Sequence, residues 1–554
     1  MSILNTRNPR ALTLLAVTLL VIVGACAYIN CLPNAMFWDD DDFILKNRFI
    51  KDWRHFPEFF TQNLVAGSYL VSNYWRPLLL TVFAAEWHWW QNWVYGWHAV
   101  SVGTHIGAGI ALYFLLNRLF GRRALSLITA VLFVAHPVHN EAVVYVNSLG
   151  DSLASVFIFS GLILYVRFRQ SKVSAFLSPP YYLSFLMLPL GIMSKETGFV
   201  LAALIPFTDF LLLNNGSFFK RLGRTLSAAW PFLALAVVYV ILRATVLNFS
   251  NSFNFYNADN APPAAGDMGL RLLTFFKAMS QYAGFLFFPL DLRVERQLPW
   301  AQSFFEPDVL FGGSLVAGML WAGLRLWQKK PLVSYGIGWF FIAIAPASNI
   351  LVPINAVLYE HFLYLPMIGV ALIVVDAAME WGRRKNLGPT LLKVLVLVLI
   401  IFIGMNARRN LDWRTSIIFY EKLVKTAPDS YRVINNLGME YANKGIHDKA
   451  EATYLKAIAL NPENPVAYHN IAGTYRDTGR TTLALENFKK AITLDPKFIF
   501  SYRSLAQLYF QLGDLAEAKK YLEVVARSDP EDQSVQQALR MINEALRAKA
   551  RALP

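Results

Sequence analysis

Apolar stretches long enough to cross a lipid bilayer recur through roughly the first three quarters of this 554-residue chain. A membrane-spanning helix needs about 20 mostly apolar residues. Eleven stretches near that length run over residues 11–30, 96–117, 124–143, 150–168, 177–193, 198–214, 229–246, 308–328, 332–350, 359–378 and 390–406. The whole chain is 55% hydrophobic and only 16% charged, and its first three quarters, which hold these stretches, cannot fold as a water-soluble domain. We therefore expect an all-α fold in which residues 1–406 form a polytopic helical membrane domain.

Clusters of Lys and Arg fall at alternate ends of these stretches. They precede the first stretch and follow the second, fourth, sixth, eighth and tenth, at Arg7, Arg10, Arg118, Arg122, Arg123, Arg167, Arg169, Lys172, Lys220, Arg221, Arg224, Lys329, Lys330, Arg383, Arg384 and Lys385. Because Lys and Arg are enriched at the cytoplasmic ends of spans, the amino terminus is predicted to lie in the cytoplasm. The net charge of +14 is largely this topology signal, so it does not indicate nucleic-acid binding. The first stretch lacks a cleavage site after a short apolar core and is predicted to remain as an anchor.

Two further stretches are left out of the count of spans. Residues 74–94 carry five tryptophans among polar groups, which favours a helix lying in the headgroup layer. Residues 268–290 are ambiguous in the same way. Counting either stretch as a span would place most later basic clusters outside the cytoplasm. Residues 31–95 are therefore predicted to form the first external loop, with interfacial helices.

The chain changes character near residue 407, where a 34-residue period begins. Its markers are the inter-repeat prolines, the glycines of the turn inside each repeat and the alanines at a close helix contact, namely Pro428, Pro462, Pro496, Pro530, Gly445, Gly479, Gly513, Ala450, Ala484 and Ala518. This period is typical of the tetratricopeptide repeat. We expect three repeats over 428–529, a linker and half-repeat over 407–427, and a capping helix over 530–554. Such a superhelix can hold a peptide or a neighbouring protein, although it could instead pack on the membrane domain.

Four consecutive aspartates follow the first apolar stretch. Adjacent carboxylates repel one another, so one of them is expected to have a raised pKa, to hold a cation, or to take a proton from an attacking hydroxyl. Asp39 and Asp40 are thus the candidate catalytic residues, and Mg²⁺ or Mn²⁺ is a candidate ligand for them. The alternative is a solvated acidic loop that merely ends a helix.

Other polar residues are expected on the same membrane face. They are His136, His139, Glu141, Asp151, Lys195, Glu196, Glu360, His361, Arg408 and Arg409. Cations and carboxylates at a lipid boundary suit chemistry on a lipid-linked phosphate, where cations bind the leaving phosphate and a carboxylate deprotonates the acceptor. The two histidines could equally be hydrogen-bonded structural residues, and Lys195 beside Glu196 could be an interfacial ion pair. A transporter would place such groups nearer the bilayer midplane.

Several motifs carry a family resemblance. They are Phe37-Trp38-Asp39-Asp40, Trp75-Arg76-Pro77-Leu78, His98, His105, His136-Pro137-Val138-His139-Asn140-Glu141-Ala142, Asp151, Ser194-Lys195-Glu196, Pro346-Ala347-Ser348-Asn349 and Tyr359-Glu360-His361-Phe362-Leu363-Tyr364-Leu365-Pro366. With the repeats, they resemble the GT-C class of membrane glycosyltransferases, and more narrowly the transmembrane and tetratricopeptide-repeat proteins that include protein O-mannosyltransferases. This resemblance implies a polyprenyl-phosphate sugar donor, a hydroxyl acceptor and inversion at the anomeric carbon.

The resemblance also implies roles for individual residues. Asp39 or Asp40 would be the base or hold a divalent cation. Lys195, Arg408 and Arg409 would contact the donor phosphate. The pocket and the sugar hydroxyls would be served by His136, His139, Glu141, Asp151, Glu196, Glu360 and His361. This chain has Glu360-His361 where relatives carry Glu-Arg, and a histidine is only partly charged near neutral pH, which weakens a phosphate-binding role there.

The expected function is transfer of a sugar, with mannose as the first candidate, to a protein hydroxyl on the extracytoplasmic face. The alternatives are a transferase that modifies an envelope glycan or lipid, and a non-catalytic membrane scaffold that displays the repeats. The short repeat array and the presence of only two cysteines favour a bacterial inner membrane with periplasmic repeats. In a eukaryote the same topology would place the repeats in the lumen of the endoplasmic reticulum.

Overall fold

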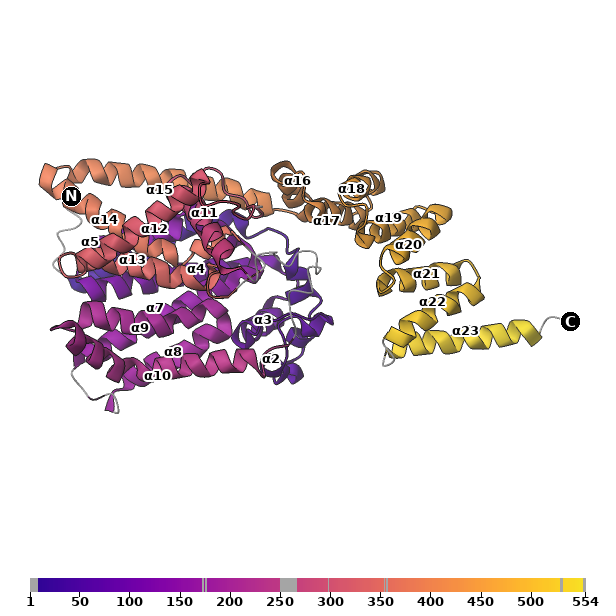
Figure 1. Cartoon of the computed structure of the whole chain (residues 1–554), viewed down its shortest axis with the longest axis horizontal. Helices are drawn as coiled ribbons and strands as arrows, with labels where there is room; N and C mark the ends of the chain where they lie inside the picture. The colour runs from indigo at the N-terminus through magenta and orange to yellow at the C-terminus, as the bar shows by residue number, and fades with distance from the viewer. Residues whose placement is uncertain are drawn as a thin grey trace. The chain divides into compact units, whose positions relative to one another are not determined.

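Two units of helices make up the protein in the computed structural model shown in Figure 1. The structure describes residues 8–171, 174, 177–249, 267–296, 298–352, 354, 357–528 and 532–551, and within these ranges it contains helices and no β-strand. The first unit is Met1–Thr415 and the second is Ser416–Pro554. Three residues of the sequence patterns lie outside the described residues, namely Arg7, Lys172 and Pro530.

The first unit is a bundle of long helices. Its helices are α1 (Pro9–Tyr28), α2 (Glu58–Thr61), α3 (Pro77–Trp90), α4 (Val94–Phe120), α5 (Arg123–Ala135), α6 (Asn140–Val144), α7 (Leu149–Ser171), α8 (Pro179–Ser194), α9 (Val200–Thr208), α10 (Phe218–Ala244), α11 (Met268–Phe287), α12 (Pro307–Leu326), α13 (Pro331–Ile344), α14 (Pro366–Lys385) and α15 (Gly388–Asn410). Seven of them, α1, α3, α8, α12, α13, α14 and α15, have proline in the first two positions. Proline favours helix starts because its φ is already helical and the amide hydrogen it lacks would be unpaired there.

All eleven predicted stretches fall on helices. Seven described helices are long and apolar enough to cross a membrane, and an eighth candidate is a bent pair. The remaining three stretches lie on α8, which has 16 residues, on the short apolar helix Pro331–Ala347, and on α14, which carries Asp376 and Glu380. These three predicted stretches therefore do not have, by themselves, the length and apolarity of a full span.

The bent pair interrupts the third predicted stretch. Arg123–Ala135 and Pro137–Val144 meet at an angle of 50°. Pro137 disfavours helical geometry at the residue before it, and His136 accordingly has φ −67° and ψ 128°. The break places His136, His139 and Glu141 at the end of the bundle instead of inside a continuous helix.

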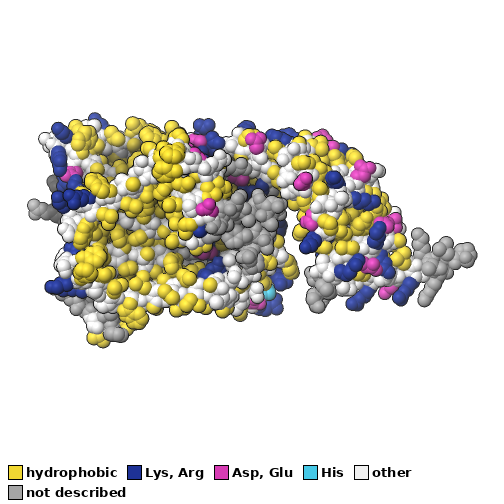
Figure 2. All heavy atoms as spheres, viewed as in Figure 1, with side chains coloured by type: hydrophobic (Ala, Val, Ile, Leu, Met, Phe, Trp, Pro, Cys, Tyr) yellow, Lys and Arg dark blue, Asp and Glu magenta, His cyan; other side chains and the backbone are white. Residues whose placement is uncertain are grey.

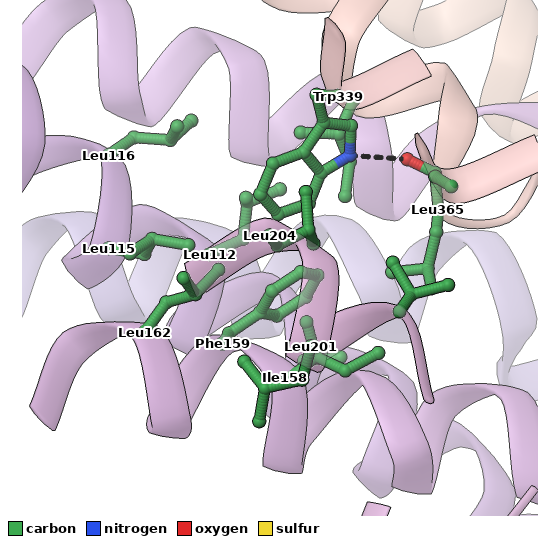
Figure 3. Packing of buried hydrophobic residues seen from close by; sticks show 14 of the residues in the cluster. Leu112, Leu115, Leu116, Ile158, Phe159, Leu162, Leu201, Leu204, Trp339 and Leu365 are labelled. Atoms are coloured by element: carbon green, nitrogen blue, oxygen red, sulfur yellow. Dashed lines mark hydrogen bonds between the residues drawn. The ribbon is translucent and has the colours of Figure 1, made fainter. Parts of the chain in front are cut away.

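The core of the first unit is apolar and closely packed. Figure 3 shows Trp339 of α13 beside Phe159 of α7 and Leu204 of α9, and the Trp339 indole N–H donates a hydrogen bond to the Leu365 carbonyl at 2.9 Å. The outer face is also largely hydrophobic, whereas Lys and Arg side chains gather at the end of the unit where the amino terminus lies (Figure 2). An apolar outer face needs lipid or another apolar partner, which agrees with a membrane domain.

The first loop forms its own small core against α3. Phe43, Phe49, Phe59 and Leu64 of the loop pack with Phe83 of α3. With 14 residues, α3 is about 21 Å long, which is too short to cross the hydrocarbon layer. Helix α11 has 20 residues but is not among the candidate spans. Neither of the two stretches left out of the predicted spans, 74–94 and 268–290, is therefore a candidate span in the described structure.

The second unit consists of helix pairs. Its helices are α16 (Ser416–Thr426), α17 (Tyr431–Asn443), α18 (His447–Leu460), α19 (Pro465–Asp477), α20 (Thr481–Leu494), α21 (Ile499–Gln511), α22 (Leu515–Ser528) and α23 (Gln533–Arg551). The turn glycines Gly445, Gly479 and Gly513 have φ between +71° and +79°, and the contact alanines Ala450, Ala484 and Ala518 are fully buried. Each residue type sits where a tetratricopeptide repeat requires it, so the repeat prediction is confirmed.

Candidate active site

The four aspartates occupy two different environments. Asp41 and Asp42 are partly exposed and form ion pairs with Lys46 at 3.5 and 3.4 Å. Asp40 is only 2% exposed, and its Oδ1 accepts a hydrogen bond from the backbone N–H of Asn147 at 2.9 Å. Asp39 is half-buried. The run that looks uniform in the sequence thus consists of a surface pair and a buried or partly buried pair.

A stack of aromatic rings fixes the backbone just before Asp39. The Trp38 ring lies on Tyr145, and Tyr145 lies on Trp413, with centroid separations of 5.4 Å in both pairs. Trp38 has φ +64°, which is a strained conformation for a bulky residue. Such strain costs about 1–3 kcal/mol and persists only where surrounding contacts impose it. The amide of Asp39 donates a hydrogen bond to the Tyr145 hydroxyl at 3.1 Å, so the stack also orients the aspartate pair.

The surroundings of Asp40 favour its protonated form. Burial raises the pKa of Asp40 well above the ordinary value for aspartate, and the neighbouring charge of Asp39 raises it further. The hydrogen bond from the Asn147 amide acts in the opposite direction but does not cancel the effect of burial. Asp39, which is half-buried, is the more accessible of the two carboxyl groups.

Lys195 and Glu196 point to different partners. The Lys195 ammonium contacts Asp151 Oδ2 at 2.6 Å, while Arg76 forms an ion pair with Glu196 at 2.7 Å. Lys195 follows the end of α8, and Asp151 lies in the first turn of α7. A side chain at position 150 would stand 3.0 Å from the Ser194 carbonyl, so Gly150 permits the two helices to approach. The sequence had left open whether Lys195 pairs with Glu196, and these contacts show that it does not.

Asp39 and the Arg76 ion pair both influence Tyr74. The Arg76 guanidinium stands over the Tyr74 ring, 4.7 Å from its centroid. Burial raises the pKa of Tyr74, and the charges of Glu196 and Asp39 raise it further, so both carboxylates act on this hydroxyl. Burial lowers the pKa of Arg76, but the charges of Glu196, Tyr74 and Asp151 outweigh it and the net direction is upward. The loop that carries Asp39 is also connected to these ion pairs by geometry, because Asp40 bonds to the amide of Asn147, four positions before the Asp151 partner of Lys195.

No sequence pattern predicts a role for Arg76. The residue stood within the Trp75-Arg76-Pro77 motif, but an arginine beside a tryptophan in an interfacial segment is common and carries no distinct signal. Its importance comes from Glu196, which lies 120 positions later in the chain. Tyr145 and Asn147 were missed for the same reason, because neither residue type has a recognisable pattern.

A second group of charges lies at the break after α5. His361 Nδ1 is 2.9 Å from Glu141 Oε1, and Arg409 contacts Glu360 Oε2 at 2.9 Å. Arg409 also donates to the Pro137 carbonyl at 3.3 Å, whereas Arg408 is exposed. Of the two arginines expected to bind phosphate, one is held by a carboxylate inside this group and the other is open to the surroundings.

Two carboxylate oxygens in this group have unused hydrogen-bonding capacity. Glu141 Oε2 and Glu360 Oε1 are buried and have no hydrogen-bond partner among the described residues. Buried polar atoms are almost always hydrogen-bonded, so atoms of this kind suggest a missing polar partner. Sugar hydroxyls are donors of the right kind for both oxygens.

The two histidines of the motif, His136 and His139, stabilise the break after α5 through hydrogen bonds to backbone groups. His136 Nε2 donates to the Leu286 carbonyl at 3.1 Å, and its Nδ1 accepts from the Val138 amide at 3.1 Å. His139 Nδ1 donates to the Phe133 carbonyl at 2.8 Å. With these bonds both nitrogens of His136 are engaged, which favours a structural role over metal binding. In the described part of the chain, no group of three or more His, Cys, Asp and Glu side chains is placed to hold a metal ion.

Comparisons with known proteins bear on both units. Models of the tetratricopeptide repeat match residues 431–464, 453–486 and 475–542. A solved structure described as the first TPR of Spaghetti (RPAP3) bound to an HSP90 peptide is 29% identical, covers 21% of this chain and 94% of that chain, and has a TM-score of 0.20.

Proteins named protein O-mannosyl-transferase are similar to the chain over most of its length. One from Caenorhabditis elegans is 23% identical and covers 80% of this chain and 62% of its own length. TMTC3 of Mus musculus is 24% identical, with coverage of 81% and 51%, and TMTC4 of Homo sapiens is 22% identical, with coverage of 77% and 64%. The chain thus spans about half to two thirds of the length of these relatives. The resemblance to the transmembrane and tetratricopeptide-repeat O-mannosyltransferases is confirmed.

Proposed function

We propose that this protein is a membrane glycosyltransferase that moves mannose from a polyprenyl-phosphate donor to a hydroxyl group of a protein. The observation that carries the proposal is that Asp40, next to Asp39, bonds to the amide of Asn147, four positions before Asp151, whose ion pair with Lys195 adjoins the pair of Arg76 with Glu196. The similarity to proteins named protein O-mannosyl-transferase supports the same reaction class. A general base beside paired cations is what transfer from a phosphate ester to a hydroxyl requires.

In the proposed reaction, Asp39 removes the proton from the acceptor hydroxyl. The acceptor oxygen forms a bond to the anomeric carbon of mannose from the face opposite the phosphate. The bond between the anomeric carbon and the phosphate oxygen breaks, and its electron pair leaves with the polyprenyl phosphate. The proton stays on Asp39 until it passes to solvent. Displacement from the opposite face inverts the anomeric configuration.

Asp39 is preferred over Asp40 as the base because of their surroundings. Asp39 is half-buried and can meet an acceptor, whereas Asp40 is buried and bonded to the Asn147 amide. The upward shift in the pKa of Asp40 favours its neutral form, which reduces the repulsion that two adjacent carboxylates would otherwise exert. Asp40 is thus assigned as a positioning residue that holds the turn on which Asp39 is carried.

Lys195 and Arg76 are assigned to the leaving phosphate. Each already has a carboxylate partner, Asp151 and Glu196 respectively, so the phosphate would share the cation with that carboxylate. Charge-assisted hydrogen bonds to phosphate oxygens stabilise the charge that develops as the bond to the sugar breaks. Arg408 and Arg409 are further candidates for the phosphate. Among these cations Arg408 is the exposed one.

The sugar is proposed to lie against the group at the break after α5. The free oxygens of Glu141 and Glu360 would accept hydrogen bonds from sugar hydroxyls, and His361 orients Glu141. The buried histidines His136 and His139 shape this wall through backbone contacts. Because the described residues bring no third ligand to Asp39 and Asp40, the proposal assigns no step to Mg²⁺ or Mn²⁺.

The repeats are proposed to recruit the acceptor protein, and the active site and repeats are proposed to face the extracytoplasmic side. A bacterial inner membrane with periplasmic repeats fits the short array, and the endoplasmic reticulum with lumenal repeats is the eukaryotic counterpart.

We propose domain limits of 1–406 for the membrane domain and 428–529 for the three repeats. The bilayer supplies the donor, and no nucleic acid takes part.

The test is transfer of labelled mannose by the purified protein in detergent, with a polyprenyl-phosphate mannose donor and envelope proteins as acceptors. Asp39→Asn is expected to lower transfer by about 100-fold or more, since general base catalysis contributes 10²–10⁴-fold. Asp42→Asn is the matched control because it lies in the same run on the surface and is expected to keep nearly full transfer.

Three outcomes would count against the proposal. Equal transfer by Asp39→Asn and the wild type would remove Asp39 from the reaction. Labelling of a lipid or glycan fraction in place of protein would favour an envelope-modifying transferase. No transfer from any polyprenyl-phosphate sugar, by a protein that still unfolds cooperatively, would favour a membrane scaffold that displays the repeats.

A further inference from the structure

A charged pocket lies at the opposite end of the first unit from the candidate active site. It has a volume of about 440 Å³, which is within the range of ligand pockets. It is formed where α4 and α14 end and where α13 begins, whereas Glu360 and Lys195 lie beyond the other ends of α14 and α8. Asp376 and Arg383 of the pocket lie 10 and 17 positions after Pro366, the first residue of α14, so about 15–25 Å of helix separates the two sites.

The walls of this pocket combine apolar and charged side chains. The apolar part consists of Leu119, Phe120, Leu212 and Leu332. The charged part consists of three cations, Arg122, Lys330 and Arg383, and two carboxylates, Asp376 and Glu380. This mixture suits a molecule with a charged head and an apolar body.

The charges of the pocket do not balance. Arg122 pairs with Asp376 at 2.5 Å, and Lys330 pairs with Glu380 at 3.4 Å. Arg383 lines the same pocket and makes no ion pair within the described ranges of the chain. One positive charge is therefore left over.

Arg122 also has unused capacity. Its Nη1 donates to Asp376, while its Nη2 is buried and has no hydrogen-bond partner in the described part of the structure. A buried guanidinium nitrogen without an acceptor is costly, and the pocket is the open space that Arg122 lines. An acceptor with negative charge in the pocket would satisfy it.

Two helices begin at this pocket without a side-chain cap and without an acidic residue in the first turn. Helices α5 and α13 have Arg122 and Lys330 at their N-caps, neither cap side chain bonds to the helix, and neither first turn contains an acidic residue. The N-terminus of a helix carries about +0.5 of an elementary charge and favours anions. The basic N-cap residues Arg122 and Lys330 add to that positive potential. An anion between them would be attracted both by the two helix N-termini and by these two side chains.

We propose that this pocket binds the phosphate of an anionic glycerophospholipid. The phosphate would contact Arg122 and Arg383 near the starts of α5 and α13, and the acyl chains would continue along the apolar walls. The site lies at the end of the unit where Lys and Arg gather, which is where a headgroup layer is expected (Figure 2). It is independent of the transfer reaction and would hold the ends of α4, α13 and α14 together.

The experiment uses the full chain purified in detergent and titrated with phosphatidylglycerol or phosphatidylcholine. Bound lipid is counted by native mass spectrometry, and the unfolding temperature is followed in parallel. Arg383→Gln changes a cation without an ion-pair partner, and Arg122→Gln with Asp376→Asn removes a matched pair of charges, so neither variant leaves an unpaired carboxylate. The matched control is Arg123→Gln, because Arg123 is the exposed neighbour of Arg122 and does not line the pocket.

The wild type is expected to retain phosphatidylglycerol about tenfold more tightly than phosphatidylcholine, and a variant carrying all three changes is expected to lose that preference. Arg123→Gln is expected to behave as the wild type. Equal lipid retention by all variants would overturn the proposal. A rise in unfolding temperature with inorganic phosphate alone that equals the rise with phosphatidylglycerol would overturn the assignment to a lipid and indicate a site for free phosphate.

Discussion

Asp40 Oδ1 accepts a hydrogen bond from the backbone amide of Asn147 at 2.9 Å, which ties the first loop to the turn before α7 across 107 positions of the chain. Through this bond and the aromatic stack of Trp38, Tyr145 and Trp413, the loop holds Asp39 in one orientation. The candidate base is thus positioned by residues that do not themselves take part in proton transfer.

Asp40→Asn is expected to stabilise the protein as the pH rises. The asparagine oxygen can still accept from the Asn147 amide, so the hydrogen bond is kept. Burial raises the folded-state pKa of Asp40, so the stability that its neutral form contributes is complete below the unfolded value of 3.8 and is lost as the pH rises through the raised pKa. The unfolding temperature of Asp40→Asn, relative to the wild type, should therefore increase between about pH 4 and the raised pKa and then level off. A variant that becomes less stable than the wild type at high pH would show that the ionised carboxylate is the stabilising form.

Tyr145→Phe is expected to reduce transfer without disrupting the loop. The change keeps the rings stacked but removes the hydroxyl that accepts from the Asp39 amide. Stability should fall by about 1 kcal/mol, while transfer should fall about tenfold because small displacements of a catalytic group are strongly felt. Tyr145→Ala removes the stack as well, and a larger loss of both properties is expected. Identical rates for Tyr145→Phe and the wild type would show that the hydroxyl does not position Asp39.

Lys195→Met separates a structural role from phosphate binding when it is compared with a double variant. The single change leaves Asp151 buried and unpaired, and it should destabilise the protein by about 3–5 kcal/mol. Adding Asp151→Asn removes the unpaired charge and should restore most of the stability. Transfer should remain low in the double variant, because the cation for the leaving phosphate is still missing. Recovery of transfer together with stability would mean that the pair is structural only.

Two glycines of the same repeat are expected to respond in opposite directions to alanine. Gly479 has φ +74°, so Gly479→Ala should destabilise the second unit by about 1 kcal/mol. Gly473 lies inside α19, where an added Cβ meets nothing within 4 Å, and Gly473→Ala should stabilise the unit by about 0.5–1 kcal/mol. Denaturant unfolding of the two variants measures both changes. The same sign for both would contradict the assigned turn.

The expectations that came from local patterns agree well with the structure. The repeat turns at Gly445, Gly479 and Gly513 and the buried contact at Ala484 follow from a 34-residue period, because each repeat packs mainly against its neighbours. The apolar stretches likewise fall on helices, because hydropathy is read over about 20 consecutive residues. The bend at His136 is an exception. Pro137 disfavours helical geometry at a single residue, and hydropathy averaged over about 20 residues does not register it.

The sequence by itself determined the helical membrane unit, the repeat unit and the residue types of the candidate site. Only the tertiary structure decided which aspartate is buried, that Lys195 pairs with Asp151, and that Arg76 pairs with Glu196. Those partners are 44 and 120 positions apart. Periodicity and composition act over one or a few helical turns, whereas such pairs form only when distant helix ends are brought together by packing, and no local pattern encodes that approach.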